Sequence, residues 1–366
     1  MTPIVLLGES QGVNEVKHGI PFVGPVGVEL LGQLNDAGLL TFTSTDRDYI
    51  RAYYTSGDPL QLDMVWRLHP EFIRLNVFNL HPPGNNMEAL CGPKDARLPG
   101  YPAIIKGKFI RAEFAPHLER LATDLNHHNP NLVIALGNTP LWALCGTTGV
   151  SKLRGTTRLS THTVADFKVL PTYHPAAVLR KIELRPVAVI DLSKALREST
   201  FPEIRRPDRA IWIEPSLADF QTFYREHIVG CSLLSVDIET AGNAITCIGF
   251  APSPRLAIVI PFFDPRRKDK SYWTNRHDEH AAWDLIRSIL MDKSIPKLFQ
   301  NGLYDIAFLY RSMKIQTHNA AHDTMLLHHA IQPESLKNLG FLGSIYTDEG
   351  AWKAYHKSRT TVKRDN

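Results

Sequence analysis

The sequence is poor in cysteine and has no long hydrophobic run, and each absence excludes a class of protein. Only 4 of its 366 residues are cysteine. No two of them form a CxxC pair, so neither a disulfide framework nor zinc-ligand spacing is indicated. No apolar stretch approaches the roughly 20 residues that a membrane-spanning helix needs. Met1 leads directly into a short apolar run, without the regions of a secretion signal. We therefore expect a cytoplasmic protein with reduced thiols.

The sequence also lacks a strong net charge and a nucleotide-binding glycine motif. The net charge is +4 and the pI about 8.8, which permits a nucleic-acid partner without requiring one. The glycine-rich turn Gly8–Gly12 is neither GxGxxG nor a P-loop, and there is no internal repeat. The hydrophobic content of 43% is typical of globular proteins, and 366 residues indicate two domains.

The first part of the chain alternates short β-rich runs with helical patterns. We expect buried parallel strands at Ile4–Leu7, Leu75–Asn79, Leu132–Leu136 and Phe167–Pro171, and helices at Val28–Ala37, Ala112–His127, Asn138–Leu144 and Leu192–Arg197. This alternation predicts an α/β domain with helices on both faces of its sheet. The segment Phe201–Arg209, rich in proline and arginine, is typical of a linker.

A second α/β unit follows the linker. We expect strands at Leu233–Ile238, Ile245–Ala251, Leu256–Pro261 and Pro296–Gln300, and helices at Ala281–Met291, Tyr304–Met313 and Thr324–Ile331. Strands before helices favour a mixed sheet. The predicted organisation is a first domain at 1–198, a linker at 199–212 and a second domain at 213–366.

Three segments of the first domain carry candidate chemistry: Gly8–Gly27, Asn76–Asn86 and Tyr173–Arg180. Each follows a predicted strand. Ligands of open α/β sheets bind beyond the carboxyl ends of strands, so the three loops are expected to converge. In order, they resemble the motifs GE-x-PG…GxPFVGxxG, CRPPGN and HPxxxLR of the family 4 uracil-DNA glycosylases. Ser151–Gly155, "SKLRG", resembles a further stretch of that family.

This resemblance covers about residues 3–190 and implies a three-layer α/β/α glycosylase domain that acts on DNA. It implies that Phe22 stacks on a flipped-out base and that Asn85 reads the base edge, since a carboxamide both donates and accepts. His174 would stabilise charge on the departing base. Glu9 or Glu15 would position water or stabilise the oxocarbenium-like sugar.

Arg180 would lie near a phosphate, because Val178–Arg180 occupies the place where the family inserts a wedge into the base stack. Singly, these residues also have ordinary structural interpretations. A His-Pro pair is usually a turn, and a lone phenylalanine such as Phe22 is more often part of a core. Only the ordered combination favours the glycosylase.

The sequence departs from the family pattern at several positions. Gln11 stands where the family has proline. The family also holds a [4Fe–4S] cluster on four cysteines. Here Leu80 and Phe114 stand at the positions of the third and fourth cysteine ligands, and the chain begins after the position of the first two. Cys91 and Cys145 do not match any of the four ligand positions. We expect no iron–sulfur cluster, with apolar packing in its place.

In the second domain, "SVDIET" places Asp237 and Glu239 two residues apart on a strand, so that both carboxylates share a face. Alone, the pair could be a surface pair at the end of a strand. Together with N-x-x-x-D at Asn301–Asp305 and "HDTMLLHHAI" at His322–Ile331, it resembles the proofreading 3′-5′ exonuclease of family A DNA polymerases. That resemblance implies a ribonuclease H-like, DnaQ-type fold.

The exonuclease resemblance implies two Mg²⁺ or Mn²⁺ ions, which hard oxygen ligands suit. Asp237 would bridge both ions, Glu239 would hold one and orient water, and Asp305 would bind the second. Asn301 would shape the site. Asp323 is expected to be a helix N-cap rather than a ligand.

The family's last motif, Y-x-x-x-D, has no match, since Tyr355 is followed four residues later by Arg359. No polymerase palm, fingers or thumb follows either. The order of domains resembles the front of bacteriophage replicative polymerases, which implies DNA and a polymerase polypeptide as partners in the host cytoplasm. The alternative is a non-catalytic DNA-binding or scaffold subunit of a split polymerase.

Overall fold

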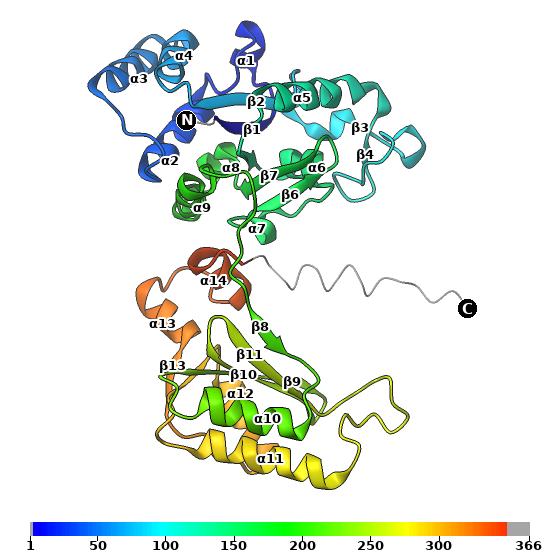
Figure 1. Ribbon diagram of the computed structural model, residues 1–366. Coiled ribbons are helices and arrows are strands. Elements are labelled where there is room, and N and C mark those ends of the chain that lie inside the picture. Colours follow the sequence, from blue (N-terminus) through cyan, green and yellow to red (C-terminus); the bar gives the residue numbers. More distant parts are fainter. Residues whose placement is uncertain (1–2, 350–366) are drawn as a thin grey trace. The chain divides into compact units, whose positions relative to one another are not determined.

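The computed structural model describes residues 3–349, which form two compact units. The first unit comprises the described residues up to Arg205 together with those from Gly340 onward, and the second is Arg206–Leu339 (Figure 1). Tyr355 and Arg359 lie outside the described residues. None of the helices in residues 3–349 is both long and apolar enough to span a bilayer.

The first unit is an α/β structure around a five-stranded sheet. Its strands are β1 (Ile4–Ser10), β2 (Phe72–Phe78), β5 (Leu132–Leu136), β6 (Arg158–Thr161) and β7 (Ala165–Thr172), and the short strands β3 (Cys91–Gly92) and β4 (Phe109–Ile110) form a separate pair. Its helices are α1 (Val13–His18), α2 (Pro25–Asp36), α3 (Ser44–Ser56), α4 (Pro59–Leu68), α5 (Ala115–His128), α6 (Asn138–Cys145), α7 (Val150–Leu153), α8 (Pro175–Arg180), α9 (Arg185–Glu198) and α14 (Leu339–Tyr346).

The main sheet has the order β2-β1-β5-β7-β6, and all its neighbours are parallel except β6 and β7. Alternate residues of each buried strand enter two different cores. Ile4 and Leu6 pack with α2, α4 and α9, whereas Val5 and Leu7 pack with α5 and α6. The three-layer α/β/α arrangement predicted from the sequence is therefore confirmed.

The second unit is built on a six-stranded sheet. Its strands are β8 (Ala210–Trp212), β9 (Leu234–Ala241), β10 (Ala244–Ser253), β11 (Leu256–Pro261), β12 (Lys297–Phe299) and β13 (Ala320–Asp323), and its helices are α10 (Leu217–Phe223), α11 (Arg276–Met291), α12 (Leu303–Met313) and α13 (Thr324–Ile331). The order is β13-β12-β9-β10-β11-β8. Strands β9, β10 and β11 are antiparallel, whereas β12 is parallel to β9, so the sheet is mixed as predicted.

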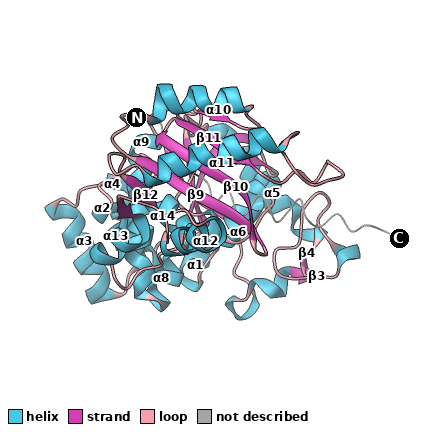
Figure 2. Cartoon of the chain, turned by 90° about the horizontal axis from the view of Figure 1, so that it is seen from below, coloured by secondary structure: helices cyan, strands magenta, loops and turns pink. Residues whose placement is uncertain are grey.

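Helices α10 and α11 cover one face of the sheet (Figure 2), and their apolar residues pack in the core of the second unit. Phe220 of α10 stacks on Phe250 of β10 at 6.3 Å between ring centroids. Along β9 the apolar side chains are buried, and the alternate positions, including Asp237 and Glu239, are exposed. The period of two therefore places the acidic pair on one face, as the sequence predicts.

Candidate active sites

The first candidate site lies where β1, β5 and β7 end. Glu9 is the penultimate residue of β1, Thr139 lies in the first turn of α6 just after β5, and His174 follows β7. The Thr139 hydroxyl donates a hydrogen bond to Glu9 Oε2, across 130 residues of sequence. Parallel strands expose their carboxyl ends at the same edge. The loops after β1 and β7 meet there as predicted, with the Phe22 and His174 ring centroids 6.5 Å apart.

Glu15 organises the loop that follows β1. Its side chain is buried and accepts hydrogen bonds from the backbone N–H groups of Gly12, at 3.0 Å, and Phe22, at 2.7 Å. Asn76 Nδ2 donates to the same carboxylate at 3.4 Å. Burial raises the pKa of Glu15, and these hydrogen bonds oppose the rise. With both oxygens engaged, Glu15 is suited to hold the loop rather than to bind a water molecule.

Phe22 is held in an unusual backbone conformation. Its φ is +58°, and its side chain is only 2% exposed. The indole N–H of Trp66 donates to the Phe22 carbonyl at 3.0 Å. A Cβ on Gly27 would lie 1.9 Å from that carbonyl oxygen, and one on Gly8 would lie 2.8 Å from the Phe22 ring. Both glycines are thus required for the position of Phe22, whose ring centroid lies 6.5 Å from that of His174.

His174 is the N-cap of α8, and its Nδ1 accepts a hydrogen bond from the backbone N–H of Ala176 at 3.1 Å. Burial, assisted by the positive charge of Arg180, lowers the pKa of His174 to about 4. The imidazole is therefore neutral at pH 7. Because Nδ1 is an acceptor, the single ring proton resides on Nε2, which is left as a donor.

Glu9 and Arg180 lie close enough to interact electrostatically. Burial raises the pKa of Glu9, while the Thr139 hydroxyl and the charge of Arg180 lower it. Arg180 is the exposed last residue of α8. The Cβ of His174 would be 3.2 Å from a Cβ on Gly137, a glycine with φ of +96°. The edge of the sheet thus combines a carboxylate, a neutral imidazole, an aromatic ring and an exposed cation.

Asn85 is exposed, with φ of +53°, on the loop after β2. Among the described contacts, none joins its side chain to Phe22 or His174. The loop itself is fastened to the loop after β1, because the Gln11 N–H donates to the Leu80 carbonyl at 3.0 Å and His81 Nδ1 lies 2.9 Å from the Gln11 carbonyl. The role of Asn85 as a reader of bases stays a prediction.

Gln11 and Leu80, two of the departures from the glycosylase motifs, contact each other through that backbone hydrogen bond. A proline at position 11 has no N–H and could not donate it. Leu80 and Phe114 pack in the same apolar core, and the Phe114 ring meets Phe78 edge-on at 6.2 Å. Apolar contacts thus occupy both positions, and the absence of an iron–sulfur cluster stays a prediction.

The second candidate site joins β9 and α12. Asp305 is buried, and its Oδ1 accepts the backbone N–H of Ile238 at 3.0 Å. Burial raises the pKa of Asp305 to about 6, and the negative charge of Asp237 adds to the rise. Glu239 extends from the same face of β9 as Asp237. Opposite Asp237 on β10 stands Gly249, which contributes no side chain.

The turn before α12 is held by Asp323. Its carboxylate accepts the N–H groups of Asn301 and Gly302, at 3.1 and 2.7 Å, and caps α13 through the N–H of Met325 at 2.8 Å. The predicted N-cap role of Asp323 is confirmed. Asn301 is exposed with φ of +59°. Asp323 and Asn301 thus set the entry of the helix that carries Asp305.

The donor chemistry of this site fits a hard divalent cation. Asp237 and Asp305 lie within electrostatic range, and the raised pKa of Asp305 marks a negative charge that lacks compensation. Within residues 3–349, however, no three His, Cys, Asp or Glu side chains converge as a ready metal site. A cation would have to draw Asp237, Glu239 and Asp305 together.

Asn76, Thr139 and Trp66 also support the site, although no motif in the sequence marks them as functional. Asn76 begins the segment Asn76–Asn86, and Thr139 lies in the helix predicted directly after a strand, so both positions carry a local signal. Their partners, Glu15, Glu9 and Phe22, are 44 to 130 residues distant in sequence.

Comparison with known families agrees with this geometry. A family model described as the uracil DNA glycosylase superfamily matches residues 1–197, and one described as 3′-5′ exonuclease matches residues 221–362. No curated protein matches the chain. The exonuclease match extends into residues that the structure packs with the first unit, from Gly340 onward. The domain limits predicted from the sequence remain a prediction.

The solved structures that are similar to part of the chain include the following two. The EXD2 exonuclease domain soaked in Mn shares 15% identity over 37% of this chain and 65% of that chain, with a TM-score of 0.25. NrnC of Brucella melitensis shares 17% identity over 39% of this chain and 62% of that chain, with a TM-score of 0.27. The chain thus spans less than two thirds of each.

Proposed function

Because the chain belongs to the uracil DNA glycosylase superfamily and carries a 3′-5′ exonuclease domain after it, we propose that it excises uracil from DNA and trims DNA 3′ ends. Both resemblances found in the sequence are confirmed by the family matches, and both families are hydrolytic. The observation that supports excision best is the neutral His174, whose Nδ1 is engaged and whose Nε2 proton is available beside Phe22.

In this proposal Phe22 stacks on the extruded base, and its strained backbone, held by Glu15 and Trp66, keeps the ring fixed. His174 donates its Nε2 proton in a hydrogen bond to the base oxygen on which charge develops as the glycosidic bond breaks. A neutral donor suits this task because it stabilises an anion without first giving up a proton.

Glu9 is the better candidate of the two glutamates for the carboxylate that stabilises the sugar cation or positions water. Glu15 uses both oxygens to hold backbone N–H groups, whereas Glu9 has one described hydrogen bond, from Thr139. Arg180 keeps Glu9 more readily ionised and extends to where a phosphate would lie. Asn85 would complete the pocket by contacting the base edge.

For the second domain we propose Asp237, Glu239 and Asp305 as ligands of Mg²⁺ or Mn²⁺. The bound cations would supply an activated water and charge neutralisation at the leaving 3′ oxygen. Asn301 and Asp323 would keep α12 in place, so that Asp305 stays at the strand. The same acidic face would repel the DNA backbone without cations, which predicts strict metal dependence.

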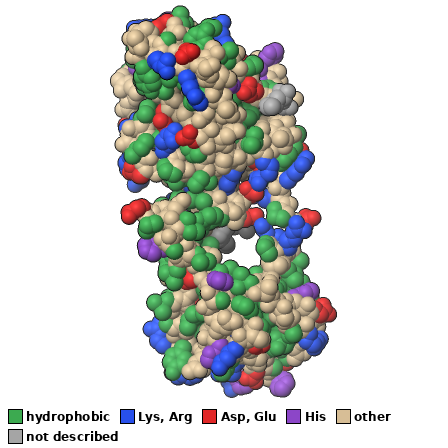
Figure 3. Space-filling view, turned by 90° about the vertical axis from the view of Figure 1, so that its left-hand side faces the viewer, with side chains coloured by type: hydrophobic (Ala, Val, Ile, Leu, Met, Phe, Trp, Pro, Cys, Tyr) green, Lys and Arg blue, Asp and Glu red, His purple; other side chains and the backbone are tan. Residues whose placement is uncertain are grey.

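We further propose that the chain acts in replication as the front part of a bacteriophage-type DNA polymerase, with a polymerase polypeptide as partner. The domain order supports this reading. In the alternative, both domains bind DNA within a split polymerase without turnover. Hydrophobic side chains occur over the face of the molecule drawn in Figure 3. Apolar side chains of α12 and α13 that are exposed, namely Leu303, Leu326, Leu327 and Ile331, offer a partner a contact surface.

The deciding experiment measures two activities of one preparation. Single-stranded DNA with one uracil is tested for abasic sites in EDTA, and 3′-labelled DNA is tested for digestion with and without Mg²⁺. Excision in EDTA that His174→Ala abolishes supports the glycosylase, and Mg²⁺-dependent digestion that Asp237→Ala abolishes supports the exonuclease. DNA binding with neither activity would favour the non-catalytic alternative.

A further inference from the structure

The first unit contains a fully buried ion pair outside the site described above. Arg154, in the "SKLRG" segment, is 1% exposed and makes a two-pronged contact with Asp191 of α9, at 2.6 and 2.7 Å. The Thr172 hydroxyl donates to the same carboxylate at 2.8 Å. A guanidinium cannot lose its proton in a protein, so a buried arginine needs partners for its N–H groups.

A further partner of Arg154 comes from the segment that follows Leu339. Arg154 Nη1 donates to the Ser344 hydroxyl at 2.9 Å, across 190 residues. The guanidinium also lies 5.6 Å from the centroid of the Phe341 ring. Lys194 of α9 donates to the carbonyls of Ser344 and Thr347, at 2.6 and 2.7 Å.

This cluster supports the backbone that leads to His174. Thr172 is the last residue of β7, two positions before His174. The Gly155 N–H donates to the Pro171 carbonyl at 2.9 Å. Gly155, with φ of +74°, has no room for a Cβ, which would lie 2.4 Å from Asp191 Oδ1 and 3.0 Å from the Ser344 carbonyl oxygen.

We propose that the segment Phe341–Asp348, which follows the second unit in the sequence and lies within the exonuclease family match, is the closing element of the first unit and positions His174 through Arg154 and Asp191. Ser344 and Lys194 act as positioning residues, since neither touches the base pocket. The functional part of this inference rests on the proposed excision of uracil.

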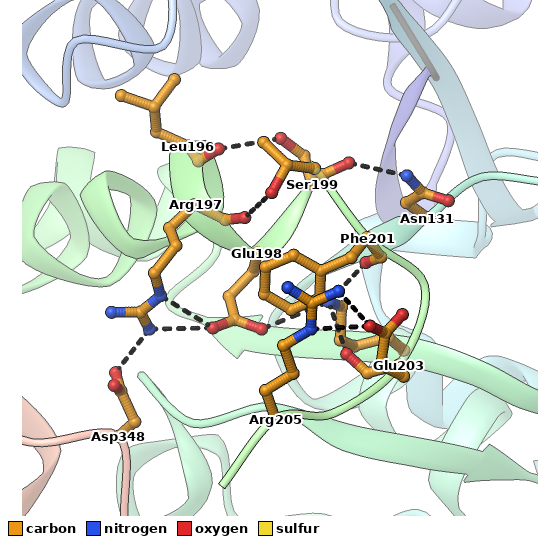
Figure 4. Close-up of polar contacts among 11 residues, drawn as sticks. Asn131, Leu196, Arg197, Glu198, Ser199, Phe201, Glu203, Arg205 and Asp348 are labelled. Carbon is orange, nitrogen blue, oxygen red and sulfur yellow. Dashed lines mark hydrogen bonds and ion pairs between the residues drawn. The ribbon is translucent and has the colours of Figure 1, made fainter. Parts of the chain in front are cut away.

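The other connection between the units is held by β7, beside the end of the same helix (Figure 4). The buried Lys168 donates to the carbonyls of Phe201 and Glu203, at 2.6 and 3.0 Å, and pairs with Glu198 at 3.3 Å. Glu198 also pairs with Arg197 at 2.8 Å.

Arg197 in turn pairs with Asp348 at 2.8 Å. The end of α9 is thus linked to both segments, because Arg197 pairs with Asp348 and Glu198 pairs with Lys168, the β7 residue that holds the segment by which the chain leaves the first unit.

The test uses the full chain with Ser344→Ala and Lys194→Met, and with Ser193→Ala as the control. Ser193 lies on the same helix but is exposed and bonds only to the Ile190 carbonyl among the described contacts. Hydrogen exchange is followed at the backbone N–H groups within residues 171–177, which are those of Thr172, Tyr173, His174, Ala176 and Ala177, together with kcat and KM for uracil excision. Circular dichroism verifies that each variant is folded at the assay temperature.

Loss of a hydrogen bond to a charged group is expected to speed exchange in 171–177 about tenfold in Ser344→Ala, with a several-fold lower kcat and unchanged KM. Ser344→Thr, which keeps the hydroxyl, should restore both. The inference fails if Ser344→Ala and Lys194→Met match Ser193→Ala in exchange, or if exchange rises while kcat does not change. If the wild-type chain excises no uracil, the proposed function fails, and the exchange comparison still decides whether the segment closes the unit.

Discussion

Comparing two substitutions of His174, to alanine and to asparagine, separates the two roles of this residue. Its Nδ1 caps α8 by accepting the Ala176 N–H, and its Nε2 proton is available to the base pocket. Alanine removes both functions. Asparagine keeps a side-chain acceptor at the N-cap, where it is among the best residues, but its amide does not extend to the position of Nε2.

The two variants should therefore differ in their free energy of unfolding but show a similar loss in the rate of excision. Losing the cap in His174→Ala is expected to lower the free energy of unfolding by about 1 kcal/mol, whereas His174→Asn should remain close to wild type. Both variants lose the donor to the departing base, for which a rate loss of ~10²–10³ is typical.

The pH dependence follows from the lowered pKa of His174. The folded chain protonates this ring near pH 4, whereas an unfolded chain does so near pH 6.5. As pH falls, the unfolded state takes up the proton first, so this contribution to stability is complete above about pH 6.5 and is lost between 6.5 and 4. Allowing for the partial exposure of the ring, the loss is about 2 kcal/mol. Excision should show no inflection near pH 6.5 that belongs to His174.

The assay is single-turnover excision from a uracil oligonucleotide between pH 5 and 8.5, with abasic sites cleaved by alkali, alongside urea unfolding of each variant. The reasoning is refuted if His174→Asn retains wild-type excision. It is equally refuted if wild-type excision falls through a pKa near 6.5 that the variant lacks.

Further predictions concern both sites. Asp237→Ala should abolish Mg²⁺-dependent digestion of 3′-labelled DNA and leave uracil excision intact, and digestion that survives this substitution would count against the assigned metal ligand. Asp305→Asn should abolish digestion. It should also raise the free energy of unfolding of the metal-free chain by about 1–3 kcal/mol, as measured by urea unfolding with EDTA at pH 7.5. The reason is that the pKa of Asp305 is raised in the folded chain, so the wild-type carboxyl loses its stabilising proton as the pH rises from about 4 through 6. Phe22→Ala should weaken binding of uracil-containing DNA by roughly 1–3 kcal/mol of stacking in a titration, and an unchanged affinity would remove the ring from the pocket. With Leu80 and Phe114 in an apolar core, the purified protein should be colourless and contain no iron by elemental analysis.

Much of the fold could be predicted because burial leaves a clear pattern. Leu132–Leu136 and Leu256–Pro261 begin and end where the sequence predicts, and both are strands with strong apolar character. The helices α3 and α4 were not predicted. The segment Ser44–Ser56 is largely polar, and its main local signal is the capping box between Thr43 and Asp46.

The candidate site was predictable only where the topology alone decides position. Glu9 and His174 follow strands whose carboxyl ends share an edge, so their approach follows from the parallel sheet. The pairing of Thr139 with Glu9 and the support of Phe22 by Trp66 depend on side chains far apart in sequence. No local sequence pattern predicts such contacts, because a threonine in a helix or a tryptophan in a core is common without any functional partner.

The return of the chain to α9 also bears on how the molecule is made. Contacts between Arg154 and Ser344 close a loop of 190 residues, and loop closure of this length is slow and entropically costly. During synthesis the ribosome must release the whole second unit before Ser344 is available to the buried arginine. The hydrogen bonds of Arg154 and Lys194 to this segment therefore form only after Arg206–Leu339 has been synthesised, although both side chains belong to the part of the chain that is made first.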